Sequence, residues 1–84
     1  MVVKSFFVLD NYFMGKDIRI EFGKVIRSLR QQHNLTQEEL ADRANISTKY
    51  LQNLEGKKPK TASIITLEKL AKAFGITISQ LLKF

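Results

Sequence analysis

The sequence predicts an all-α fold of five helices over residues 17–84, preceded by a short extended, strand-like segment over residues 1–16. Three observations favour this fold class. Apolar residues recur at helical spacing from residue 18 to residue 82. Each of these runs begins just after a Ser, Thr or Asp that can cap a helix. The 84-residue chain contains no cysteine, so its stability must come from well-patterned helices without disulfides or thiolate metal sites.

The first fourteen residues are rich in β-branched and aromatic residues, which favours a strand. A lone strand is unstable in water, so we expect Val2–Leu9 to pair with the same strand of a second chain or to pack on the helices. The apolar run Phe6–Leu9 is too short for a signal peptide. In another interpretation, Met14 is the natural start and residues 1–13 are an extension without function.

The first helix is expected from about Arg19 to His33, with Asp17 as its N-cap. Asn34 can take the left-handed position that usually goes to glycine after a helix end. The predicted apolar face of this first helix consists of Ile18, Phe22, Val25, Ile26 and Leu29.

The second helix should begin at a capping box formed by Thr36 and Glu39, and should end near Ala44–Asn45. The third should follow Ser47 and run to about Glu55, with Gly56 as its stop. Leu51 and Leu54 face inward, and the opposite side is polar with one acid at its far end. A helix that enters a DNA groove needs such a side, although any solvated helix can show it.

Residues 57–62 form a basic loop in which Pro59 prevents the helix from continuing. Ser63 should cap a fourth helix over Ile64–Phe74, which Gly75 ends. Thr77 should cap a short fifth helix over Ile78–Lys83. The apolar face of the fourth helix consists of Ile64, Leu67, Leu70, Ala71 and Phe74.

The charge and the residue types favour some classes of function and count against others. Lys and Arg number 14 against 8 for Asp and Glu, so the net charge is +6, which points to an acidic partner such as nucleic acid. One His, no Trp and no Cys provide little for catalysis or metal binding, so we expect no enzyme, no metal site and no cofactor. No apolar run reaches the roughly 18–20 residues of a membrane helix.

The short connection Asn45–Ser47 between the second and third helices is the sequence form of a helix-turn-helix. Residues 35–41, Leu-Thr-Gln-Glu-Glu-Leu-Ala, together with Ile46-Ser47, Tyr50-Leu51 and Leu54-Glu55, resemble the phage repressor/Cro type of helix-turn-helix, the XRE family. Residues 22–30 resemble the first helix of that family, residues 67–76 its fourth and residues 77–82 its fifth. The family usually has Gly at position 34, and one residue between the equivalents of Glu55 and Gly56.

The resemblance implies that the third helix lies in the major groove of double-stranded DNA. Lys49 would then donate to guanine, Asn53 would pair with adenine, Thr48 would meet thymine or donate, and Gln52 would be a further reader. The expected contacts to the DNA backbone are Gln37, Tyr50, Lys57, Lys58, Lys60 and Arg43. The lysines could instead be a solvated charge run, and Arg43 could pair with a neighbouring acid.

The resemblance also implies an ion pair between Arg30 and Glu55, which would hold the third helix against the first. His33 lies in the last turn of the first helix, where a cation is favoured, and we expect it to be structural.

The family usually binds two-fold symmetric operators as homodimers. One candidate dimer surface is the fifth helix, and the other is the strand at Val2–Leu9, although both could be ordinary core. The fifth-helix surface consists of Ile78, Leu81, Leu82 and Phe84.

The resemblance therefore implies a sequence-specific transcription regulator in the cytoplasm of a prokaryote or of phage origin, with no small-molecule ligand. A phage-like repressor, a restriction–modification controller and an antitoxin are all compatible with the sequence. The alternative is a protein-interaction module, such as an antitoxin or adaptor, for which DNA binding is secondary.

Overall fold

The computed structural model describes residues 17–83, and all of their regular structure is helical, which confirms the predicted fold class. The expected extended segment lies outside the described residues. The helices are α2 (Ile18–Gln32), α3 (Gln37–Ala44), α4 (Thr48–Leu54), α5 (Ile64–Phe74) and α6 (Ile78–Leu81). None of these helices is long and apolar enough to cross a membrane.

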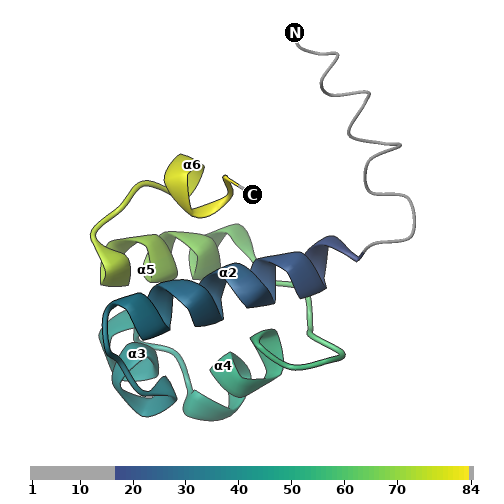
Figure 1. The fold of residues 1–84 in the computed structure, drawn as a ribbon, viewed down its shortest axis with the longest axis horizontal. Helices are drawn as coiled ribbons and strands as arrows, with labels where there is room; N and C mark the ends of the chain where they lie inside the picture. Colours follow the sequence, from purple (N-terminus) through teal and green to yellow (C-terminus); the bar gives the residue numbers. More distant parts are fainter. Residues whose placement is uncertain (1–16, 84) are drawn as a thin grey trace, which may run out of the picture.

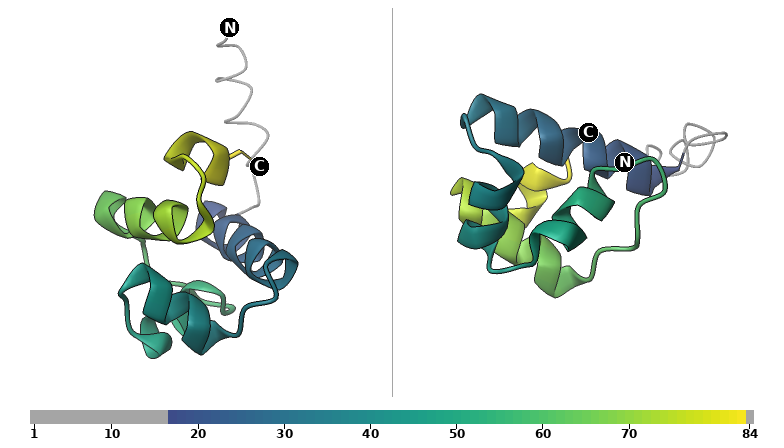
Figure 2. Two further views of the ribbon diagram at one scale, coloured as in Figure 1. Left: turned by 90° about the vertical axis from the view of Figure 1, so that its left-hand side faces the viewer. Right: turned by 90° about the horizontal axis from the view of Figure 1, so that it is seen from below.

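The helices form three levels. α2 and α5 lie side by side in the middle, with α3 and α4 on one side of them and α6 on the other (Figures 1 and 2). The short chain between α3 and α4 places these two helices together at the edge of the molecule. The loop from α4 to α5 then crosses from this edge to the central level.

All five predicted N-caps are present. The side chains of Asp17, Ser47 and Ser63 accept hydrogen bonds from backbone N–H groups in the first turn of their helices. Thr36 forms the complete capping box with Glu39, and Thr77 forms a second one that the sequence analysis missed. Arg19 donates to the Asp17 carboxylate, and this hydrogen bond lowers the pKa of that carboxyl below its usual value.

The helix ends follow the predictions in part. Asn34 has a φ of 56° and Gly75 a φ of 72°, the left-handed conformation expected at both positions, and Asn45 adopts it too, with a φ of 57°. α4 ends one residue early, because Glu55 caps it, and Gly56 takes no left-handed conformation. α6 ends at Leu81 instead of Lys83.

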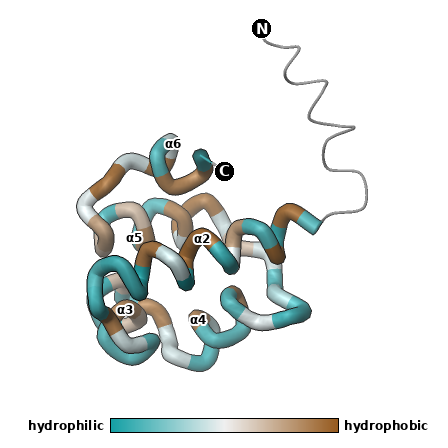
Figure 3. The backbone as a smooth tube through the Cα atoms, in the orientation of Figure 1, coloured by the Kyte–Doolittle hydropathy of each residue, from teal (hydrophilic) through white to brown (hydrophobic). Residues whose placement is uncertain are grey.

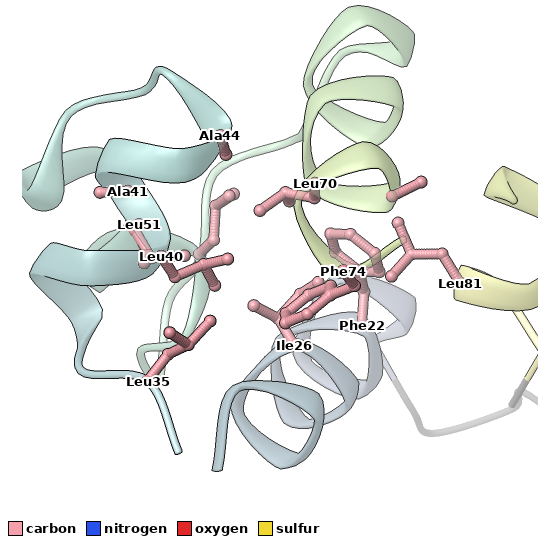
Figure 4. Close-up of a cluster of buried hydrophobic side chains, with 12 residues drawn as sticks. Phe22, Ile26, Leu35, Leu40, Ala41, Ala44, Leu51, Leu70, Phe74 and Leu81 are labelled. Atoms are coloured by element: carbon pink, nitrogen blue, oxygen red, sulfur yellow. The ribbon is translucent and has the colours of Figure 1, made fainter. Parts of the chain in front are cut away.

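The core lies where α2, α3, α4, α5 and α6 converge (Figure 4). Leu35 joins it from the turn before α3, and the buried Leu40 lies in the first turns of that helix, the arrangement called a hydrophobic staple. The buried apolar residues are Phe22, Ile26, Leu35, Leu40, Ala41, Ala44, Leu51, Leu54, Leu70, Ala71, Phe74 and Leu81.

The prediction that Ile18 and Ile64 belong to apolar faces turned toward the core is wrong. Ile18 is 52% exposed and Ile64 is 73% exposed. Each is the first residue of its helix, so it projects beyond the zone where the neighbouring helices meet. Helical spacing gives the direction of a side chain around the axis but not the length of helix that the core covers.

α2 and α4 make a close approach at Gly23. A β-carbon on Gly23 would lie 2.3 Å from the carbonyl oxygen of Leu54, so only glycine fits there. Gly23 is buried in the middle of α2, and Leu54 is the last residue of α4. The contact therefore sets how closely the carboxyl end of α4 can rest on α2.

We predict that Gly23→Ala destabilises the protein by about 1–3 kcal/mol, the usual cost of overpacking. In an unconstrained helix interior the same change would stabilise by roughly 0.5–1 kcal/mol, because alanine favours the helix. The sign of the change in the free energy of unfolding, measured by urea denaturation, therefore distinguishes overpacking from an unconstrained helix interior. Gln31→Ala on the exposed side of α2 is the control. A stabilised Gly23→Ala variant would contradict the close approach.

Candidate nucleic-acid interface

The outer face of α4, opposite the buried Leu51 and Leu54, carries the four predicted base contacts. Lys49 and Gln52 are exposed, while Thr48 and Asn53 are half-buried. The chain between α4 and α5 continues this polar surface, and Figure 3 shows it as mostly hydrophilic. We call residues 56–62, which contain Lys57, Lys58 and Lys60, the lysine loop.

The structure brings most of the predicted DNA contacts together around two hollows. The larger, of about 390 Å³, is lined by Lys49, Gln52, Asn53, Gly56, Lys57 and Lys58. The smaller, of about 220 Å³, is lined by Ser47, Lys49, Tyr50, Asn53 and Lys60. Among residues 17–83, no acidic residue lines either hollow, so both present a positive, hydrogen-bonding surface.

Asn53 joins α4 to the lysine loop. Its side-chain oxygen accepts a 2.8 Å hydrogen bond from the backbone N–H of Lys60. Pro59, the residue before, is buried and also holds the loop in place. The sequence predicted the two segments separately but not this bond, because a seven-residue separation across an irregular loop leaves no periodic signal.

Tyr50 has a structural contact in addition to its position at the smaller hollow. Its hydroxyl lies 3.4 Å from the Oγ1 of the buried Thr66, which lies 3.1 Å from the Oγ of Ser63. Ser63 is the N-cap of α5. The hydroxyl of Tyr50 therefore links α4 to the start of α5.

Glu55, at the end of α4, is the one buried charged residue among residues 17–83. The guanidinium of Arg30 donates to both of its carboxylate oxygens, at 2.9 and 3.0 Å. The ion pair that the resemblance implied is therefore present, and it has the planar two-bond geometry in which arginine binds carboxylates most strongly. Arg30 also donates to the carbonyl of Leu35, at 3.0 Å, in the turn before α3.

Two further residues that the sequence analysis did not place here converge on Glu55. The side-chain nitrogen of Gln37 donates to one carboxylate oxygen at 3.1 Å. Arg27 donates to the backbone carbonyl of Glu55 at 2.9 Å. Gln37, predicted as a phosphate contact, thus also ties the start of α3 to the end of α4.

Arg27 extends the positive surface from the lysine loop onto α2. With Lys24 and Lys57 it lines a further hollow of about 250 Å³, and the only acid among the described residues that line it, Glu55, is already paired. Lys24 lies 3.5 Å from Glu21, so its charge is partly compensated. The i, i+3 spacing of Lys24 and Arg27 is a signal that could have found this pair from the sequence.

The remaining predicted site residues are spread over the molecule. Arg43 is exposed in the last turn of α3, and no ion pair within residues 17–83 includes it. His33 packs against Phe74, with 5.2 Å between ring centroids. Within the same residues, no group of three His, Asp or Glu side chains could hold a metal ion.

The predicted dimer residues of the fifth helix separate into two groups. Leu81 has no exposed surface and belongs to the core, which is the alternative that the sequence left open, so it is not available to a second chain in the folded domain. Ile78 packs partly against the core, whereas Leu82 is 41% exposed. Phe84 lies outside the described residues.

Comparison with known proteins gives a consistent result. Residues 26–81 match the protein family described as "Helix-turn-helix". Control protein C.MunI from Mycoplasma sp is 35% identical over 66 residues, which is 77% of this chain and 88% of that protein. Control protein C.BamHI from Bacillus amyloliquefaciens is 32% identical over 72 residues, which is 84% of this chain and 88% of that protein.

Solved structures agree with the sequence relatives. The restriction-modification controller protein C.AhdI from Aeromonas hydrophila superposes with a TM-score of 0.70 at 30% identity, covering 75% of this chain and 94% of that one. SinR, described as a master regulator for biofilm formation and solved in complex with DNA, superposes with a TM-score of 0.68 at 27% identity, covering 74% and 98%.

We predict that Glu55→Gln destabilises the domain by about 3–5 kcal/mol, because it leaves the guanidinium of Arg30 without its buried partner. The control is Glu68→Gln, the same substitution in the exposed i, i+4 pair with Lys72, where the ion separation is 3.9 Å. That change should cost no more than about 0.5 kcal/mol. Equal losses of unfolding free energy for the two variants, measured by urea denaturation at pH 7, would show that Glu55 does not hold α4 against the neighbouring helices.

Proposed function

This chain belongs to the helix-turn-helix family of DNA-binding transcription regulators, and we propose that it reads a two-fold symmetric operator as a homodimer. The observation that carries this proposal is the positive outer side of α4, where the predicted base contacts and the lysine loop meet around one hollow. The proposed activity is binding, without a catalytic step, a cofactor or a small-molecule ligand. It would take place in the cytoplasm of a prokaryote, with the protein of prokaryotic or phage origin.

The proposed reading helix is α4, lying in the major groove. Lys49, which lines both hollows, would donate to guanine O6 and N7. Thr48 would meet a thymine methyl group or donate a hydrogen bond, and Gln52 would be a further reader. The seven-residue helix rests on α2 and α3, so these side chains start from a fixed framework.

The proposed contacts to phosphate surround α4. Lys57, Lys58 and Lys60 approach the DNA backbone from the lysine loop, and Tyr50 and Arg43 approach it from the helices. Gln37 lies at the start of α3, where free backbone N–H groups favour an anion. Its amide nitrogen carries a second hydrogen that can be donated to a phosphate oxygen while the first remains on Glu55.

Selection of bound duplexes from a random DNA pool, at near-physiological salt, tests the proposal. We expect an enriched two-fold symmetric motif whose half-sites are about 34–36 Å, or a multiple of one turn, apart. Absence of any enriched motif would favour the alternative, an antitoxin or adaptor that binds chiefly another protein.

We predict that Lys49→Ala weakens binding to the selected operator by about 1–3 kcal/mol and has little effect on scrambled DNA, because it removes one base contact.

The double variant Lys57→Ala, Lys58→Ala should weaken binding to both DNAs and lower the salt slope by roughly 2, about one per lost phosphate contact. Fluorescence anisotropy titrations at several salt concentrations measure both effects. Equal losses of Lys49→Ala on the two DNAs would remove Lys49 from the base contacts.

The proposed dimer surface is an apolar hollow of about 250 Å³, where the start of α2, the end of α6 and the lysine loop meet. Ile18 and Leu82 are exposed at 52% and 41% on its rim. Exposed apolar side chains around a common hollow are typical of a surface that another chain covers. The apolar lining residues are Ile18, Phe22, Ala62, Leu67 and Leu82.

We predict that Leu82→Ser shifts the protein from dimer to monomer in sedimentation analysis while the helical circular dichroism is unchanged. Gln31→Ser, at the opposite end of α2 from Ile18, is the control and should remain dimeric. The monomeric variant should bind a full operator with an affinity close to that for an isolated half-site. A Leu82→Ser variant that stays dimeric would place the dimer contact elsewhere.

A further inference from the structure

The hydrogen bond between Asn53 and the lysine loop determines which end of the Asn53 amide faces that loop. A backbone N–H group can only donate, so the atom 2.8 Å from the nitrogen of Lys60 must be the side-chain oxygen. Oxygen and nitrogen lie on opposite arms of the planar amide, so the nitrogen points away from Lys60. No hydrogen bond within residues 17–83 uses that nitrogen as a donor.

The position of Asn53 makes this orientation relevant to DNA. Asn53 is half-buried and lines both the larger and the smaller hollow, next to Lys49 in each. A base edge that reached Lys49 in either hollow would therefore also be near the Asn53 amide. The group that Asn53 has free for such an edge is its NH₂.

We propose that Asn53 reads DNA as a hydrogen-bond donor and selects guanine over adenine. The familiar pairing of asparagine with adenine needs the amide oxygen to accept from N6 while the NH₂ donates to N7, and here that oxygen is turned toward the lysine loop and accepts from it. Guanine offers two acceptors, O6 and N7, to a donor. Thymine offers one acceptor, O4, adenine offers one, N7, next to its N6 donor, and cytosine offers only a donor.

The same bond gives Asn53 a second effect as a positioning residue. It holds the backbone at Lys60 against α4. The buried Pro59 and the lysines of the same loop are positioned together with it. An uncharged side chain thereby sets where Lys57, Lys58 and Lys60 stand relative to the outer face of α4. Loss of the acceptor at position 53 should therefore weaken binding to any DNA, in addition to the loss of one base preference.

Asn53→Asp separates the two effects. A carboxylate can still accept from the backbone of Lys60, but it replaces the free NH₂ by an acceptor. The base preference at one operator position should reverse from guanine to cytosine, whose N4 donates. Asn53→Ala removes the acceptor as well and should lose affinity for operator and scrambled DNA alike.

This inference rests on the proposed function, so the experiment starts from the operator selected with the wild-type protein. Binding of wild type, Asn53→Asp and Asn53→Ala is measured to duplexes that carry each of the four bases at every half-site position. We expect one position at which wild type prefers guanine and Asn53→Asp prefers cytosine, each by roughly 5- to 150-fold, the ratio that corresponds to one good base contact. Gln31→Glu, on the exposed side of α2, adds the same charge away from the interface and should not change the preference at that position.

The outcomes distinguish the two proposals. If wild type discriminates bases but Asn53→Asp alters no position, or alters one at which wild type prefers adenine, this inference is overturned and the proposed function stands. If wild type binds every duplex equally, the proposed function fails and this inference fails with it. Retained affinity of Asn53→Ala for scrambled DNA would overturn the positioning effect alone.

Discussion

The buried carboxylate of Glu55 is the interaction on which the rest of the structure depends. It lies at the cap of α4 and draws donors from both neighbouring helices, Arg30 from α2 and Gln37 from α3. Two charged groups out of water are stable only when their hydrogen-bonding capacity is filled, and here the carboxylate accepts two hydrogen bonds from Arg30 and one from Gln37. The close contact between Gly23 and Leu54 adjoins this cluster, so polar and steric constraints act on the same end of α4.

This clamp matters because α4 has seven residues, too few to be helical on its own in water. Its shape comes from the Ser47 cap at one end, Glu55 at the other and the burial of Leu51 and Leu54 between them. All four contacts lie at its ends or on its inner side. The outer face is consequently not needed to hold the helix in place, and its side chains start from a fixed backbone.

The parts of the structure that could be predicted from the sequence are those that depend on neighbours three or four residues away. The five N-caps, the left-handed Asn34 and Gly75 and the bounds of α5 follow from such local contacts. The bonds of Gln37 to Glu55 and of Asn53 to Lys60 could not be predicted, because they join segments whose approach is known only once the helices are packed. For the same reason, periodicity turned Ile18 and Ile64 toward the core, against the observed exposure of both, and could not decide whether Leu81 lies in the core or on a dimer surface.

The loop bond of Asn53 also bears on how such a regulator can diverge. The donor is the backbone of Lys60, so any residue except proline at position 60 keeps the bond. The number of charged residues in the loop can therefore change during evolution and raise or lower the affinity for any DNA, while the side chains of α4 keep their positions. Duplicated copies of the chain could thus diverge in affinity and in target through separate sets of substitutions, so that a change in one property need not compromise the other.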